Sequence, residues 1–295
     1  MIRHIATIVT LSAAFFHVCA ADSLFAEINK FVSGFDATVG VAVITATDTI
    51  EINCDRTYPL ASVMKFPQAL AACEVMQENG ISVDSVVTMT KSDLHENTYS
   101  PICQIFPGGV SLTIDSLFSF SIAQSDNNAC DKIFSMLISP SETESYLHGL
   151  GYRSFAIAVT EDDMHRNPYT IRANSASPVD VAALFKKFAD GQLISGEYYK
   201  SVRNALKNCQ TGIDQLHKPL AADDIILHKT GTGFRGKDGR ITAQNDAGWI
   251  CLSDGTEYAI AVMITDSAED DATNSAIIAG VSGIVRDYFT YRPQK

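Results

Sequence analysis

Strand-like patterns occur at both ends of this chain, and the long segment between them has helical patterns. Five segments have the apolar content or alternation of strands: 38–46, 49–53, 225–229, 243–252 and 258–265. Between about residues 62 and 207 the strongest apolar periodicities are helical. Because strands must pair, the two ends are expected to build one antiparallel sheet, with the helical middle inserted between them.

Helical segments complete this prediction of an α/β (α+β) fold. They are 23–33, 66–78, 112–122, 126–138, 142–149, 178–189, 195–207 and 273–291. The helix-flanked sheet domain is expected to comprise residues 21–58 and 208–295, and an all-helical domain residues 59–207. A cleft between two such parts is the expected place for a site.

The first twenty residues have the order of a secretory signal peptide. Arg3 and His4 precede an apolar run over residues 5–16, and the small Ala20 follows. The run is too short to span a bilayer. We expect cleavage after Ala20 and a mature protein that is periplasmic or secreted, with no membrane segment. Lipid attachment at Cys19 is less favoured, because no small residue stands where a lipidation signal needs one.

Charge and cysteine spacing exclude several kinds of partner. The net charge is -12, from 22 basic and 34 acidic residues, and no basic run offsets it, so nucleic acid is not expected as a partner. Six cysteines remain after Cys19, widely spaced, and no specific disulfide pairing is predicted. No metal-binding spacing occurs, so neither a metal nor another cofactor is expected.

Ser62 and Lys65 form the first chemical motif, S-x-x-K. Ser62 opens a helical run and Lys65 lies one turn later, so both side chains can share a face. A serine needs a neighbour that takes its proton, and a desolvated lysine can do so. On its own the spacing is weak evidence, because a serine often merely caps a helix.

Two further motifs, each present once, change that balance. Ser125-Asp126-Asn127 precedes a helical stretch, and Lys229-Thr230-Gly231 ends a predicted strand. Each alone has a structural explanation, as a helix cap or a strand exit. All three in this order are roughly a one-in-a-thousand coincidence at ordinary composition.

S-x-x-K, S-D-N and K-T-G are the motif set of class A β-lactamases and penicillin-binding proteins. The chain resembles the serine β-lactamase and DD-peptidase superfamily over essentially the whole mature sequence, including the order of its helices and strands. The resemblance implies a hydrolase of the β-lactam amide, acting as a monomer on a small-molecule β-lactam without a cofactor.

The resemblance also implies a deacylating glutamate on a loop between the second and third motifs. Glu161 occupies that place, with Asp162 and Asp163 as alternatives. His165 stands where class A enzymes usually have asparagine. Together with the sequence Asn-Asp-Ala-Gly at 245–248 and the aromatic Tyr99, it resembles the extended-spectrum branch typified by Bacteroides-type cephalosporinases. Cephalosporins are therefore expected among the substrates.

The resemblance implies these catalytic roles. Ser62 attacks the lactam carbonyl, and the backbone N–H groups of Ser62 and Thr232 form the oxyanion hole. Lys65, Glu161 or both act as the base in acylation, a point in dispute for such enzymes. Ser125 passes a proton to the leaving lactam nitrogen.

Substrate-binding roles follow in the same way. Asn127 binds the side-chain amide of the substrate, while Lys229, Thr230 and Thr232 hold its carboxylate through charge and hydroxyl donors. Tyr99 and His165 are expected to contact the substrate at the edge of the cleft.

One departure concerns the arginine that usually supports carboxylate binding. The first of its two usual places holds Gln215, and beyond the third motif Arg235, Lys237 and Arg240 are all candidates. A penicillin-binding DD-peptidase and a β-lactam sensor that acylates without turnover remain alternatives. A glutamate at position 161 argues against the first of these.

Overall fold

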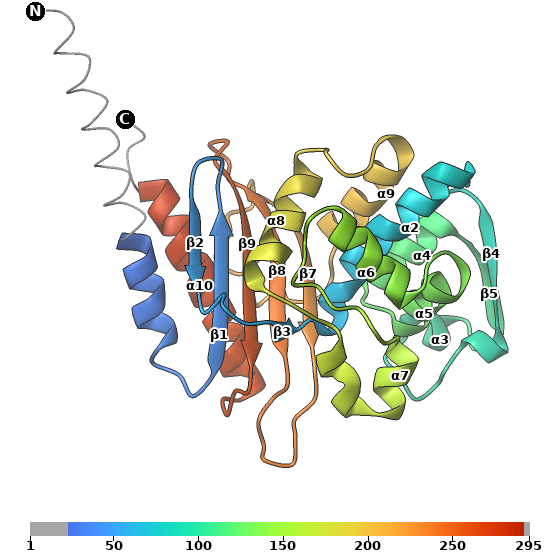
Figure 1. Ribbon diagram of the computed structural model, residues 1–295, viewed down its shortest axis with the longest axis horizontal. Helices are drawn as coiled ribbons and strands as arrows, with labels where there is room; N and C mark the ends of the chain where they lie inside the picture. The colour runs from blue at the N-terminus through green and yellow to red at the C-terminus, as the bar shows by residue number, and fades with distance from the viewer. Residues whose placement is uncertain (1–22, 292–295) are drawn as a thin grey trace, which may run out of the picture.

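A computed structural model describes residues 23–291 of the 295. The predicted signal peptide at residues 1–20, with Cys19, lies outside the described residues. Five strands form one antiparallel sheet in the order β2-β1-β9-β8-β7 (Figure 1). Their bounds are β1 Thr38–Ile44, β2 Thr49–Ile52, β7 Ile225–Thr232, β8 Gln244–Cys251 and β9 Glu257–Thr265. The first and last parts of the chain therefore build one sheet, as the sequence predicts.

The two faces of this sheet differ in side-chain size. In β9 the residues on one face are Tyr258, Ile260, Val262 and Ile264, and those on the other are Ala259, Ala261 and Met263. The larger side chains pack against the N-terminal helix over residues 23–32 and against α10 (Asp271–Tyr291). Small residues on the opposite face let α8 (Pro178–Ala189) pack closely over β1, β8 and β9.

Most other helices form a second body beside β7 (Figure 1). They are α2 (Lys65–Asn79), α3 (Pro101–Ile105), α4 (Ile114–Phe118), α5 (Asn127–Met136), α6 (Pro140–Gly149), α7 (Glu161–Arg166) and α9 (Gly196–Lys207). Short 3-10 helices η1 (Ala61–Met64), η2 (Lys91–Asp93) and η4 (Pro168–Ala173) and a π-helix, η3 (Ser119–Ala123), accompany them. Helix α2 is buried on nearly all sides, which places it at the centre of this body. Its Phe66 stacks on Phe185 of α8, with ring centroids 4.1 Å apart, and so joins the two parts of the core.

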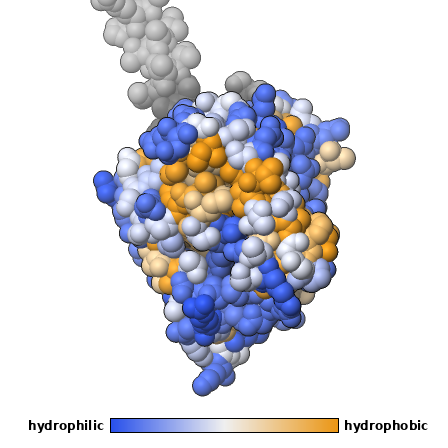
Figure 2. Space-filling model, turned by 90° about the vertical axis from the view of Figure 1, so that its right-hand side faces the viewer, coloured by the Kyte–Doolittle hydropathy of each residue, from blue (hydrophilic) through white to orange (hydrophobic). Residues whose placement is uncertain are grey.

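The structure adds two short strand pairs to the part predicted as all-helical. Strands β4 (Val86–Thr90) and β5 (Gly109–Thr113) form a pair at the far end of the molecule, where Figure 2 shows apolar side chains gathered on the surface. The predicted helix over 112–122 is wrong in its first residues. Thr113 ends β5 and its side chain accepts the N–H of Ser116, so the helix begins only at α4.

The second added pair positions the first motif. β3 (Tyr58–Pro59) pairs with β6 (Ser175–Ala176), which brings the chain before Ser62 next to the chain that follows Glu161 and η4. Two residues far along the chain then hold the same segment. The carbonyl of Asn174 accepts the N–H of Leu60, and the Asn245 amide donates to the carbonyls of Pro59 and Leu60.

Candidate active site

The backbone is strained at Ser125 and at the residue before Ser62. Ala61, directly before Ser62, has φ of 46°, and Ser125 has φ of 58°. Residues with a side chain seldom adopt positive φ, and such strain persists only where the surroundings enforce it, often at functional sites. At Ser62 the enforcing contacts are the hydrogen bonds that fix Leu60.

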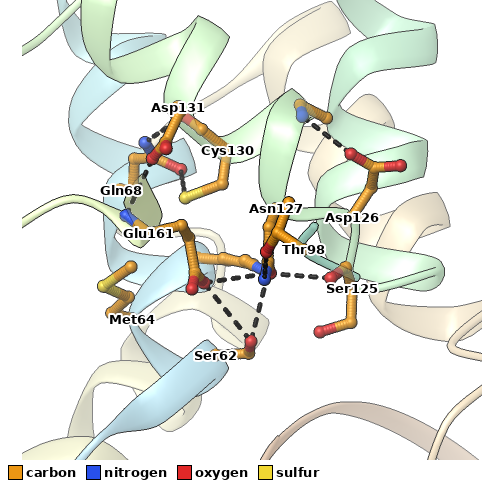
Figure 3. A network of polar contacts seen from close by, with 12 residues as sticks. Ser62, Met64, Gln68, Thr98, Ser125, Asp126, Asn127, Cys130, Asp131 and Glu161 are labelled. Atoms are coloured by element: carbon orange, nitrogen blue, oxygen red, sulfur yellow. Dashed lines mark hydrogen bonds and ion pairs between the residues drawn. The ribbon is translucent and has the colours of Figure 1, made fainter. Parts of the chain in front are cut away.

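Ser62 of η1 and Lys65 of α2 lie beside Glu161 of α7, although α7 is far along the chain from both, and Figure 3 shows Ser62 and Glu161 pointing toward one another. The Ser62 Oγ lies 3.0 Å from Lys65 Nζ and 3.4 Å from Glu161 Oε1, and the Lys65 Nζ lies 3.0 Å from the same carboxylate oxygen. Lys65 is fully buried and Glu161 nearly so. The three predicted residues therefore form one connected group.

Lys65 has more acceptors around it than it has protons. Its Nζ also reaches the Ser125 carbonyl at 2.8 Å and Asn127 Oδ1 at 2.6 Å (Figure 3). An ammonium has three N–H donors, and four acceptors surround this one. Lys65 donates to Ser62 Oγ, and the Ser62 hydroxyl in turn can donate to the Glu161 carboxylate, so its proton has a path to that carboxylate.

The second motif also caps a helix, which is the structural role that its sequence allows. Asp126 is the N-cap of α5, and its carboxylate accepts the N–H of Ala129 at 2.8 Å. The same carboxylate accepts the N–H of Ile102 and the hydroxyl of Ser100, both at 2.8 Å, which fixes the segment that follows Tyr99. The cap therefore leaves Ser125 and Asn127 free to face the cleft.

The third motif contributes a second buried lysine. The Lys229 Nζ donates to Ser125 Oγ at 3.0 Å and to the Thr230 carbonyl at 2.8 Å. Burial lowers the pKa of Lys229 to about 8. Ser125 Oγ thus lies beside one lysine, and its backbone carbonyl beside the other.

Gly231 lets β7 approach the turn that carries Ser62. A Cβ at this position would lie 2.4 Å from the Leu60 carbonyl oxygen and 3.1 Å from the Ser62 nitrogen. A side chain cannot fit there. The close approach brings the backbones of Ser62 and Thr232 to one cleft, which both residues line.

This cleft has a volume of about 640 Å³. Two groups of polar and charged residues form its walls. We call Ser62, Lys65, Ser125, Asn127 and Glu161 the helical wall, and Thr211, Gln215, Lys229, Thr230 and Thr232 the β7 wall. Both lysines lie fully buried behind the lining, and the other eight residues line the cleft, as do Tyr99 and His165, both of which are exposed.

Asp131 is a residue that the sequence reasoning missed. One carboxylate oxygen accepts the N–H of Glu161 at 2.8 Å (Figure 3). The other accepts the N–H of Asp162 at 2.7 Å. Burial, with the Glu161 charge added, raises the pKa of Asp131 to about 7. Its place one helical turn after Asn127, on the same side of α5, was the available signal.

The two alternatives to Glu161 point elsewhere. Asp162 forms an ion pair with Arg166, and the Asp163 carboxylate accepts the N–H and hydroxyl of Thr160 in a capping box. Only Glu161 among these three carboxylates contacts Ser62.

None of the three candidate cations beyond the third motif lines the cleft. Arg235 donates to Asp271 and to the Glu269 carbonyl, and Arg240 pairs with Asp36. Lys237 lines a separate depression. Gln215 does line the cleft, and its buried Oε1 has no hydrogen-bond partner.

The described residues hold no cluster of His, Cys, Asp and Glu suited to a metal ion. Within residues 23–291, no helix has the length and apolarity needed to cross a membrane. The six cysteines of this region are all free thiols.

Comparisons with known proteins find β-lactamases that are similar in sequence and in structure. A model described as the "Beta-lactamase enzyme family" matches residues 23–289. A β-lactamase of Bacteroides uniformis is 37% identical over 264 residues, 88% of this chain and 89% of that protein. The extended-spectrum β-lactamase PER-1 of Pseudomonas aeruginosa is 31% identical over 280 residues, 94% and 91% of the two chains. A crystal structure of a class A β-lactamase from Bacteroides cellulosilyticus DSM 14838 has a TM-score of 0.88 and 33% identity, covering 92% of this chain and 99% of that one. The similarity spans both the sheet and the inserted helices.

Proposed function

We propose that this chain hydrolyses β-lactams through an acyl-enzyme on Ser62. The chain belongs to the class A serine β-lactamases and is therefore a hydrolase of β-lactams. The contact of Ser62 Oγ with both Lys65 Nζ and Glu161 Oε1 carries this proposal. A serine hydroxyl becomes an effective nucleophile when a neighbouring base can take its proton, and the Glu161 carboxylate and the lysine lie within reach of this one.

Acylation begins with attack of Ser62 on the lactam carbonyl. The proton passes to Lys65 or Glu161, and the backbone N–H groups of Ser62 and Thr232 stabilise the oxyanion. Ser125 then gives its proton to the lactam nitrogen as the C–N bond breaks. The contact of Ser125 Oγ with Lys229 Nζ supports this role, because a nearby ammonium favours loss of the hydroxyl proton.

Deacylation requires a water that attacks the ester, with Glu161 as its general base. Asp131 holds the backbone of Glu161 through the hydrogen bond to its N–H, so it acts as a positioning residue. Lys229, Thr230 and Thr232 are proposed to bind the substrate carboxylate. Asn127 is proposed to bind the side-chain amide, and Tyr99 and His165 to contact the substrate at the edge of the cleft.

Cephalosporins are proposed among the substrates. The relative PER-1 is named an extended-spectrum β-lactamase, and His165 and the 245–248 segment are the features that resemble this branch. Export to the periplasm or the medium, cleavage after Ala20 and a monomeric mature protein belong to the same proposal; the residue pattern of 1–20 supports the export.

The test is hydrolysis of a chromogenic cephalosporin by the mature protein, followed past one equivalent of product, with Ser62→Ala as the background control. We expect many turnovers per enzyme molecule. A burst of about one equivalent that then stops would contradict the proposed deacylation and favour a penicillin-binding or sensor protein.

A further inference from the structure

A cysteine, a histidine and an aspartate lie together behind the β7 wall, and the proposed reaction uses none of them. His228 in β7 and Asp246 in β8 are buried on neighbouring strands, with the ring Nδ1 2.9 Å from Asp246 Oδ1. The same ring lies close enough to the thiol of Cys209, which follows α9, for the two groups to shift each other's pKa. The other Asp246 oxygen accepts the N–H of Leu216. An oriented base next to a nucleophile is the arrangement that activates catalytic cysteines.

The charges around this cluster favour a thiolate with an imidazolium. Burial alone would lower the pKa of His228, but the charge and hydrogen bond of Asp246, and then Cys209, raise it to about 10. Burial alone would raise the pKa of Cys209, but the hydrogen bond and charge of His228, the charge of Lys229 and the Thr211 hydroxyl lower it to about 7. The charged groups that act on the sulfur are thus His228 and Lys229 of β7, with Asp246 of β8 on the far side of the imidazole.

The other described cysteines have raised thiol pKa values, in contrast to Cys209. Burial raises the pKa of Cys54 to about 11, and it also raises the pKa values of Cys73, Cys103, Cys130 and Cys251. Cys73 and Cys130 are buried, whereas Cys54, Cys103 and Cys251 are partly exposed, as is Cys209. Exposure therefore does not separate Cys209 from these three, but its His228 partner does.

A short chain of hydroxyls connects Cys209 to the cleft. Its Sγ lies 3.3 Å from Thr211 Oγ1, which lies 2.5 Å from Thr230 Oγ1. Both threonines line the cleft. A group attached to the sulfur would occupy the space next to Thr211 and disturb its contact with Thr230.

We propose that Cys209, oriented and activated by His228 and Asp246, is a second nucleophilic site, which takes small soft carbon electrophiles and whose alkylation weakens binding of the substrate carboxylate. With iodoacetamide the sulfur forms a bond to the methylene carbon, the carbon–iodine bond breaks and iodide leaves with the electron pair. The thiol proton resides on His228. The effect on binding rests on the proposed role of the β7 wall, whereas the reactivity does not.

The first test measures reactivity by peptide mass spectrometry after brief treatment of the native enzyme with limiting iodoacetamide. Cys209 should label before Cys54, Cys103 and Cys251, which serve as internal controls. Its rate should rise through about pH 7. In His228→Gln the rate at pH 7 should fall about tenfold, because an ordinary thiol is only a few per cent ionised there.

Equal labelling of Cys209 and Cys54 at pH 7 would overturn the reactivity claim, as would an unchanged rate in folded His228→Gln. If that variant does not fold, the pH profile of native Cys209 decides instead, and a midpoint above pH 8 would overturn it.

The second test measures KM and kcat for a carboxylate-bearing β-lactam before and after alkylation. KM should rise several-fold with kcat changed less than twofold, and in Cys209→Ser the reagent should leave KM as it was. A native enzyme alkylated at Cys209 with unchanged KM would refute the link to the cleft. Absence of any turnover would instead count against the proposed function, while labelling would still report on Cys209.

Discussion

The two walls of the cleft differ in how completely their polar groups are satisfied. In the helical wall, Lys65 contacts four acceptors and Glu161 is held through both its side chain and its backbone. In the β7 wall, the Gln215 oxygen has no partner. A proton-transfer group works only if its geometry is preset, whereas a binding surface tolerates an acceptor that waits for a ligand. The difference suggests that the helical wall carries the chemistry and the β7 wall the recognition.

The largest expected effect tests the helical wall. Ser62→Ala should lose turnover by at least about a thousandfold and should no longer be labelled by penicillin, because the acyl bond has no oxygen to form on. Intact-protein mass spectrometry measures the label. Ser121→Ala is the matched control, because this serine is buried among the helices outside the cleft lining and its hydroxyl has no partner. Labelling that persists in Ser62→Ala would remove Ser62 as the nucleophile.

A smaller but still large effect is expected from Asp131. Asp131→Ala leaves the N–H groups of Glu161 and Asp162 without acceptors, which should cost roughly 2–4 kcal/mol of unfolding free energy. It should also slow deacylation about tenfold or more, since Glu161 loses its anchor. Denaturant unfolding and the lifetime of the acyl-enzyme measure the two effects. Asp131→Asn keeps one acceptor oxygen and should show less of both, and equal losses in the two variants would argue against positioning.

The contribution of the β7 wall is expected to appear in the pH dependence of kcat/KM. The pKa of Lys229 is about 8, so the lysine is charged at pH 7 and neutral at pH 9. If the charged form binds the carboxylate as proposed, kcat/KM should fall about tenfold between these pH values, mainly through KM. Steady-state kinetics from pH 6 to 9.5 measures this. Cys209→Ser removes the thiol that also titrates in this range, and loss of the pH effect in that variant would reassign it to the cysteine.

The smallest expected change would make the β7 wall more like the usual family pattern. Gln215→Arg places a cation where the unpartnered Oε1 now faces the cleft, and KM for carboxylate-bearing β-lactams should fall several-fold, about 1 kcal/mol of binding. Gln215→Met, which is neutral and of similar length, is the control. An unchanged KM in the arginine variant would mean that the carboxylate does not bind near Gln215.

Much of the fold could be predicted from local pattern. The sheet strands and helices α2, α5, α6, α8, α9 and α10 follow apolar periodicity and caps, which are properties of neighbouring residues. The β4–β5 pair could not be found in this way, because β4 alternates in burial within only five residues and exposes Val86. Helix α8 was assigned to the inserted part, yet it packs on the sheet, a choice that depends on the small residues of β9.

The site shows the same limit. Motif spacing located Ser62, Lys65 and Lys229, and the structure brings them into contact with the residues expected beside them. Asp131 and the pairing of His228 with Asp246 were missed. Asp131 depends on where the backbone of Glu161 lies, and the His228–Asp246 pair depends on how β7 and β8 are aligned. Neither can be read from one segment of the sequence.

The most direct test of the central claim is the fate of the acyl-enzyme in Glu161→Ala. Intact-protein mass spectrometry follows the variant and the native enzyme after mixing each with one equivalent of a cephalosporin. We predict that the native adduct disappears within the dead time of hand mixing, and that the variant keeps an adduct on Ser62 for at least about a hundred times longer. Full turnover by Glu161→Ala, with no persistent adduct, would contradict the claim that the helical wall supplies the deacylating base.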